Sequence, residues 1–429
     1  NEEVYMIKTN SENTVLYKEK NSNISIIIAA LLIFVLLLMR DTYSIAINKY
    51  IFLFVVGLCT VCMKINNLIY LFCFLFPLYV GLPGNYLTLL LIIRLVFSVR
   101  IFNASSLMLS MAVAVCIFIQ NILTGYTGIV PMILIAGVIL VLMLFTCNKE
   151  ILDPLPMILM YSAGVAALGL IMLLSTLQVY ELIDLMSTSF RLGSSSVKYV
   201  EDEIMNVSVD PNFYGMFSIA SISLAFPLIL NSRTKSGVKI CLIIFVLTSL
   251  IVCLIGLSRA FVLIFAVWMI LYFLSQNNIK GSIVVLISIA VLVGILIKFM
   301  PNVIETVLAR FEDSDMATGN GRIRLINEFF NKWSANVVTM LFGVGLFNCN
   351  VHCMPLQFLF GGGLVMFILV FALFISYRPS KTHKIKFSDL LPFIVTFMAM
   401  CTVPSATLIN YFFPIVLIGL CMQNEKKLD

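Results

Sequence analysis

The chain has 429 residues, of which 61% are hydrophobic and 11% are charged, and its mean hydropathy is +1.08. A soluble protein of this length carries about a quarter charged residues, so the composition excludes a soluble globular domain. The net charge of +6 is modest and gives no indication of nucleic-acid binding. The apolar runs are long and lack the alternation of an outer-membrane barrel, so they predict an all-α, polytopic integral membrane protein.

The first 20 residues are polar and mixed in charge, which predicts a solvated tail and no cleavable signal peptide. With about 15–22 apolar residues taken as one span, the chain after this tail divides into about 12–14 transmembrane helices. The expected spans are 24–39, 45–63, 67–82, 86–99, 107–124, 129–146, 156–177, 212–230, 238–257, 261–274, 282–300, 356–377, 390–403 and 406–422.

Lysine and arginine are unevenly distributed among the loops. The loops 231–239, 275–281 and 377–386 and the tail after 423 are basic and nearly free of acidic residues, whereas most acidic residues lie in the loops 178–211 and 301–355. Because basic loops stay in the cytoplasm, both long loops are expected on the outer face. His383 falls in a basic inner loop and is read as a solvated side chain.

These features predict seven regions along the chain. They are a cytoplasmic tail (1–23), a first helix bundle (24–177), an outer loop (178–211), further transmembrane helices (212–300), a large outer loop with the candidate catalytic residues (301–355), C-terminal transmembrane helices (356–422) and a second cytoplasmic tail (423–429).

Two short motifs open spans in the second half. Asp210 precedes Pro211, which suits an N-cap followed by the first turn of a helix. Ser258 and Arg259 lie between two spans on the expected outer face, where the distribution of charge disfavours arginine. Arg259 is either an interfacial anchor or a ligand for an anion, and the absence of a nearby acidic residue in sequence favours the ligand.

The stretch 318–333 reads as an amphipathic helix lying on or in the membrane interface. Glycines precede it, and apolar residues recur at Ile323, Ile326, Phe329, Phe330 and Trp333. Two arginines in its first turn are unfavourable at that end of the helix dipole unless an anion binds there. Arg322 is the better phosphate ligand, because Arg324 has the alternative of pairing with Glu328.

A glycine pair and a histidine follow that helix. Gly343 and Gly345 predict a tight turn with a close backbone approach. His352 is either an interfacial side chain or a general base, and its position near Arg310, Arg322 and Arg324 favours the base. Cys349 and Cys353 flank it, which leaves open a disulfide or, less favoured, a zinc site.

Two features carry weaker signals. Arg94 lies inside an expected span, where an arginine serves a function or pairs with a neighbouring helix or a lipid phosphate. The run Gly361–Gly363 most simply allows close packing of helices.

The order of these motifs resembles the bacterial O-antigen polymerase and ligase superfamily. The likeness covers roughly 208–374 and rests on Asp-Pro-Asn, Ser-Arg, Gly-Arg before a helix, Phe-Gly-Val-Gly and a late histidine, although Cys353 stands where the family often has asparagine. It implies a metal-independent inner-membrane glycosyltransferase without cofactor, in which Arg259 and Arg322 hold the donor diphosphate and His352 activates the acceptor hydroxyl. Further candidate contacts to the diphosphate or glycan are Asn212, Arg310, Arg324, Glu328 and Arg94.

The expected reaction is polymerisation of undecaprenyl-diphosphate-linked repeat units, which serve as donor and acceptor, into O-antigen or a related polysaccharide at the periplasmic face. The bilayer is the other expected partner, with a chain-length regulator and a flippase as further candidates and no nucleic acid. The alternatives are a ligase that transfers glycan to lipid A–core and a flippase for lipid-linked oligosaccharides. A flippase is disfavoured because Arg94 is the one clear charge inside the expected spans.

Overall fold

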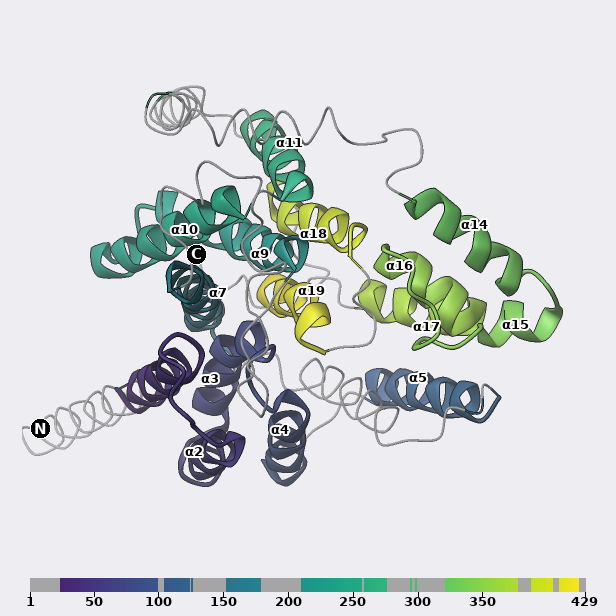
Figure 1. The fold of residues 1–429 in the computed structure, drawn as a ribbon, viewed down its shortest axis with the longest axis horizontal. Helices are drawn as coiled ribbons and strands as arrows, with labels where there is room; N and C mark the ends of the chain where they lie inside the picture. The colour runs from purple at the N-terminus through teal and green to yellow at the C-terminus, as the bar shows by residue number, and fades with distance from the viewer. Residues whose placement is uncertain are drawn as a thin grey trace, which may run out of the picture.

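The computed structural model describes residues 24–98, 104–123, 125, 152–178, 210–256, 258–275, 294, 298, 321–376, 387–403 and 409–423. Within this part of the chain the regular structure is helical and there are no strands, as Figure 1 shows, so the predicted all-α class is confirmed.

Most predicted spans coincide with a helix to within a few residues. The expected spans 129–146 and, apart from single positions, 282–300 lie outside the described residues. Before the labelled elements comes a helix at Ile24–Asp41. The others are α2 (Lys49–Cys62), α3 (Ile65–Leu78), α4 (Gly84–Ser98), α5 (Ala104–Leu123), α7 (Pro154–Leu177), α9 (Pro211–Leu230), α10 (Ser236–Ile255), α11 (Arg259–Ser275), α14 (Arg322–Trp333), α15 (Val337–Phe342), α16 (Met354–Leu356), the π-helix η1 (Gln357–Gly361), α17 (Gly362–Ser376), α18 (Phe387–Met400) and α19 (Ile409–Gln423).

Apolar side chains cover much of the outside of these helices, as expected where lipid is the solvent. Phe97 is 83% exposed, Val61 79% and Leu274 77%. Within the described part, five helices are long and apolar enough to cross a membrane, and several shorter apolar helices accompany them. The chain is therefore described as a helical membrane protein.

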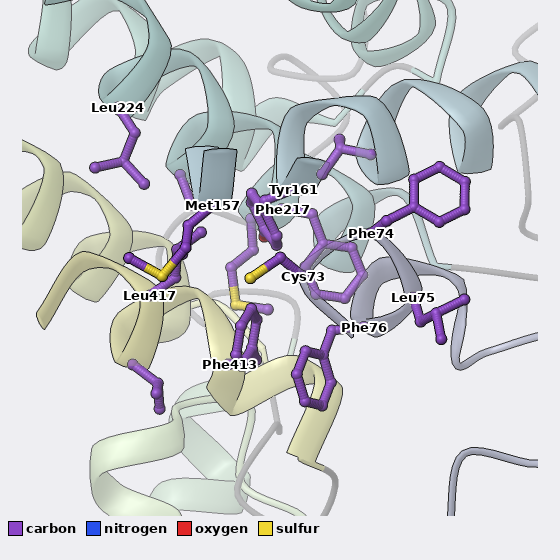
Figure 2. Close-up of a cluster of buried hydrophobic side chains, with 14 of the residues drawn as sticks. Cys73, Phe74, Leu75, Phe76, Met157, Tyr161, Phe217, Leu224, Phe413 and Leu417 are labelled. Atoms are coloured by element: carbon purple, nitrogen blue, oxygen red, sulfur yellow. The ribbon is translucent and has the colours of Figure 1, made fainter. Parts of the chain in front are cut away.

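The core is built around α3, which packs against α7 and is buried on nearly every side. In the close-up of Figure 2, side chains of α3, α7, α9 and α19 meet, including Phe76 and Phe413, whose rings stack with centroids 3.8 Å apart. Burying such aromatic side chains contributes about 1.5–3 kcal/mol each when the alternative is water, and less when it is lipid.

Contacts between helices fix their relative directions. The Tyr70 hydroxyl accepts a hydrogen bond from the amide of Asp153, and Phe74 packs on Gly164 further along, so α3 and α7 run parallel. The Tyr214 hydroxyl contacts the Val165 carbonyl while Ser221 contacts Ser162 nearer the start of α7, so α9 runs antiparallel to both. These directions agree with the alternation of spans expected from the sequence.

Candidate active site

The first part of the candidate site is the meeting point of the starts of α9 and α11. Asp210 caps α9, since its Oδ1 accepts a hydrogen bond of 2.7 Å from the amide of Asn212, and Pro211 occupies the first turn as predicted. The buried hydroxyl of Ser258 lies 3.0 Å from Oδ1 of Asn212 and donates to it. Arg259 follows Ser258 as the first residue of α11 and is half-buried. The Asp-Pro-Asn and Ser-Arg motifs therefore lie together.

The second part is the start of α14. Gly321 precedes this helix with a φ of 80°, a left-handed conformation that favours glycine, and no acidic residue lies in the first turn. Arg322 is half-buried and Arg324 is exposed. Among the described residues, neither arginine forms an ion pair with a carboxylate. The positive end of the helix dipole and two arginines therefore coincide in a first turn that holds no acidic residue.

The apolar face of α14 holds this helix on the rest of the protein. Phe329 is buried, and Ile326 and Trp333 pack with it against Phe360 and its neighbours. Of the apolar positions in the predicted stripe, Ile323 and Phe330 are each 48% exposed. The amphipathic helix is confirmed, with part of its stripe facing outward.

Glu328 pairs with a different residue from the one considered in the sequence. Its carboxylate lies 2.6 Å from Nζ of Lys332, one turn further on, and both side chains are exposed. The hydrogen bond from Lys332 lowers the pKa of Glu328, and the charge of Arg324 contributes less. Arg324 is therefore not engaged in the ion pair with Glu328 that the spacing allowed.

His352 links the two parts of the site. Its half-buried position lowers the pKa of the imidazole, the charge of Arg322 lowers it further, and the charge of Asp210 acts in the opposite direction. These effects require both charged groups to lie near His352. The charges of Asp210 and Arg322 therefore both act on His352, and the lowered pKa favours the neutral imidazole that a general base requires.

The segment before His352 is held by close backbone contacts. Gly343 and Gly345 have φ values of 79° and 105°, and the amides of Val344 and Gly345 donate to the carbonyls of Phe360 and Gly361 at 2.9 and 3.0 Å. A Cβ at Gly343 would collide with the Gly361 carbonyl. The tight turn with close backbone approach is confirmed.

The run Gly361–Gly363 lies where α17 approaches the end of α15 and the turn that follows it. Gly363 has a φ of 79° and interrupts α17, and a Cβ there would collide with the carbonyl of Leu341. These glycines let the 341–346 backbone, which includes the end of helix α15, approach closely, and amides of the turn donate to the carbonyls of Phe360 and Gly361.

Two buried glutamines, which the sequence analysis missed, support the same turn. The side-chain amide of Gln120 on α5 donates to the carbonyls of Phe342, at 2.8 Å, and Gly361. That of Gln357 donates to the carbonyl of Cys349 at 2.9 Å. A glutamine inside an apolar run is the signal that indicates such a role, since a buried amide needs partners.

The remaining candidates lie elsewhere or outside the described residues. Arg94 donates a hydrogen bond of 3.4 Å to the carbonyl of Met63, between α2 and α3. Figure 1 shows α4, the helix that carries Arg94, apart from α14 and α16. Arg310 lies outside the described residues.

The cysteines beside His352 are free thiols. Cys349 is buried, whereas Cys353 is half-buried. Within the described ranges there is no group of three or more His, Cys, Asp or Glu side chains that could hold a metal ion, so the zinc alternative gains no support.

Comparison with known proteins adds no family. No protein-family model matches the chain, and no curated protein matches it.

Proposed function

We propose that this protein is a membrane glycosyltransferase that polymerises undecaprenyl-diphosphate-linked oligosaccharide repeat units at the outer face of the bacterial inner membrane. The observation that carries the proposal is the convergence of a neutral, half-buried His352 with Arg322 at an uncapped helix start. The order of motifs, which resembles that of the O-antigen polymerases and ligases, supports the same function.

Arg322 is assigned to the donor diphosphate. Its guanidinium is always ionised and can bind two phosphate oxygens at once, and the start of α14, where Gly321 provides no side-chain cap, adds to the positive potential. As the bond between the anomeric carbon and the diphosphate oxygen breaks, negative charge grows on the leaving group. A cation held in this position stabilises that charge without a metal ion. Arg259 is the candidate second cation, because it begins α11 beside Ser258.

His352 is assigned to the acceptor. Its neutral imidazole takes the proton from a sugar hydroxyl while the hydroxyl oxygen attacks the anomeric carbon, and the diphosphate leaves with the lipid carrier. The charge of Asp210 stabilises the imidazolium that results, since it favours the protonated form. General-base catalysis of this kind contributes about 10²–10⁴-fold.

The distribution of buried charge favours an enzyme over a flippase. In the described part of the chain the fully buried charged residues are Arg40 and Asp41, whose side chains pair at 2.6 Å. A transport path through the bundle would need further charged groups along the helices. Arg259 and Arg322 lie instead at the starts of α11 and α14.

The test uses purified protein in bilayer nanodiscs with an undecaprenyl-diphosphate repeat unit and a chelator. We expect a ladder of coupled units, lost in Arg322→Gln and retained in the control Arg233→Gln, whose arginine lies between α9 and α10. Glycan transferred to added lipid A–core in place of a ladder would identify a ligase. Movement of labelled lipid-linked units across the bilayer without coupling would overturn the enzymatic assignment.

A further inference from the structure

The short helix α15, which follows α14, presents an apolar surface that is exposed within the described part of the chain. Val337 is 69% exposed and Val338 54%, and Leu341 is exposed as well. On α14, Ile323 and Phe330 lie seven residues apart, so these two exposed side chains share one flank of that helix. A continuous apolar surface of this kind is unfavourable in water and marks a contact with lipid or with another protein.

The contacts of α15 place it at the level of the hydrocarbon core. Leu341 lies against Gly363, because a Cβ on that glycine would collide with the Leu341 carbonyl. Gly363 comes nine residues after Met354, the start of the apolar segment Met354–Ala372, and nine helical residues rise about 13 Å. The whole segment has 19 residues, about 28 Å of helix, close to the roughly 30 Å of a hydrocarbon core. Leu341 therefore lies below the boundary at which this segment enters the core.

The helix α5 leads to the same level for the end of α15. The side-chain amide of Gln120 donates to the Phe342 carbonyl at 2.8 Å. Ile122 and Leu123, which end α5 beyond Gln120, are apolar and exposed, so the lipid-facing surface of α5 continues past this level. Since α15 packs against both α5 and α17 (Figure 1), its exposed surface is continuous with the surface that these helices present to lipid.

Polar groups in the turn between α14 and α15 have partners within the hairpin, as burial in hydrocarbon requires. Asn336 and Thr339 exchange hydrogen bonds in a capping box at the start of α15. The Thr339 hydroxyl also donates to the carbonyl of Trp333 at 2.8 Å, and the indole of Trp333 donates to the Met340 carbonyl at 3.1 Å. The turn can therefore enter an apolar environment without losing hydrogen bonds to water at these groups.

The exposed charges of α14 lie away from its apolar flank. Arg324, Glu328 and Lys332 recur at intervals of four and are exposed. At 3.6 residues per turn, they lie about 150° around the helix from Ile323 and Phe330. This division suits an interfacial helix, whose charged side faces the headgroups and whose apolar flank faces the acyl chains.

We propose that the hairpin of α14 and α15 is embedded in one leaflet of the bilayer, the leaflet that holds the start of the Met354–Ala372 segment. Helix α15 lies among the acyl chains, and the charged side of α14 lies among the phospholipid headgroups. The hairpin anchors the segment that carries Arg322 to the membrane at a position that was not among the predicted spans. The inference does not depend on the proposed glycosyltransferase activity.

The first test identifies the solvent around tryptophans placed on the hairpin. Val338→Trp and Phe330→Trp probe the proposed lipid surface, and Asn331→Trp, next to Phe330 but on the polar side of α14, is the matched control. Each variant is reconstituted in nanodiscs of phosphatidylcholine with or without bromine on the acyl chains, and acrylamide is the quencher in water. The fluorescence of wild type, from the native Trp268 and Trp333, is subtracted.

We expect brominated chains to quench the fluorescence added by Val338→Trp and Phe330→Trp more strongly than acrylamide does, with the reverse order for Asn331→Trp. Stronger quenching of Val338→Trp by acrylamide would show that α15 faces water and would overturn the inference. Protection of Val338→Trp from both quenchers would show that protein, such as a second copy of the chain, covers α15. That result would overturn the inference as well.

A second test needs no substitution and so does not depend on the folding of these variants. Wild-type protein in nanodiscs that contain a phospholipid with a diazirine on its acyl chain is illuminated, digested and analysed by mass spectrometry. The exposed apolar residues of α10, such as Ile240 and Ile244, provide the positive control. Labelling of α15 together with α10 supports the inference, whereas labelling of α10 without α15 would overturn it.

Discussion

Arg322 lies near enough to His352 for its positive charge to lower the pKa of the imidazole, and Asp210 opposes this effect from the start of α9. The three side chains come from separate elements: a helix cap, a helix start and a loop. Their convergence supplies a cation for an anionic leaving group and a neutral base for the attacking hydroxyl, which is the basis of the function proposed above.

The pKa of His352 is expected to lie below its ordinary value and to respond in opposite directions to its two neighbours. Arg322→Gln removes a positive charge and should raise the pKa, whereas Asp210→Asn removes a negative charge and should lower it further. Asparagine can still cap α9, so the helix is preserved. The chain has two histidines, so ring-labelled histidine in a His383→Gln background gives one NMR titration to follow.

If neither substitution moves that titration, the charges do not lie beside the imidazole. The pH dependence of the coupling rate should shift in the same directions as the pKa of His352. The base works when deprotonated, so the rate falls as the pH drops through the pKa of His352, and Asp210→Asn shifts this fall to lower pH.

The turn at Gly343 should tolerate no side chain. Gly343→Ala combines a φ of 79° with a collision against the Gly361 carbonyl, and we expect a loss of about 1–3 kcal/mol in the free energy of unfolding. The matched control is Gly237→Ala in α10, where a Cβ meets nothing within 4 Å and helix propensity favours alanine. Thermal unfolding in detergent should show a lower midpoint for the first variant only; equal midpoints would contradict the described turn.

Gln120 should contribute to stability through its side-chain amide. Gln120→Leu leaves the carbonyls of Phe342 and Gly361 without this donor, which should cost about 1–3 kcal/mol. Thr248→Val is the control, because that hydroxyl contacts only the Ile244 carbonyl in its own helix. The midpoint of thermal unfolding measures both, and a loss no greater than that of the control would show that Gln120 does not support the turn.

Arg40 and Asp41 form a buried ion pair, and removing either charge alone should destabilise the protein. Arg40 also donates to the Gly81 carbonyl at 2.6 Å, and Phe52 lies beneath its guanidinium. Asp41→Asn leaves a buried charge uncompensated and should cost about 3–5 kcal/mol. The double variant Arg40→Met with Asp41→Leu should recover much of this loss in the same unfolding assay. A double variant as unstable as the single one would argue against charge as the cause.

The sequence predicted those structural features that depend on residues close together in the chain. Runs of apolar residues located the helices, and glycine followed by recurring apolar residues located α14. The glycines of the Gly-Val-Gly turn were predicted because glycine alone readily adopts positive φ. Asp210 was expected only as a helix cap, since nothing nearby in sequence relates it to His352.

Long-range partners could not be predicted in this way. Gln120 donates a hydrogen bond to the carbonyl of Phe342, far along the chain, and Cys349 and Cys353 are free thiols rather than bonded to each other. Arg40 and Asp41 follow the first apolar run and read as its polar end, yet both are buried. Such pairs depend on helix packing, which a single sequence does not determine.

The measurement that tests the central claim most directly compares the initial rate of repeat-unit coupling in His352→Gln with that in His383→Gln, at neutral pH with saturating donor. If His352 is the general base, its loss should slow coupling about 10²–10⁴-fold while binding of the lipid-linked donor is retained, and the His383 variant should match wild type. A wild-type rate in His352→Gln would contradict the proposed catalytic role of His352.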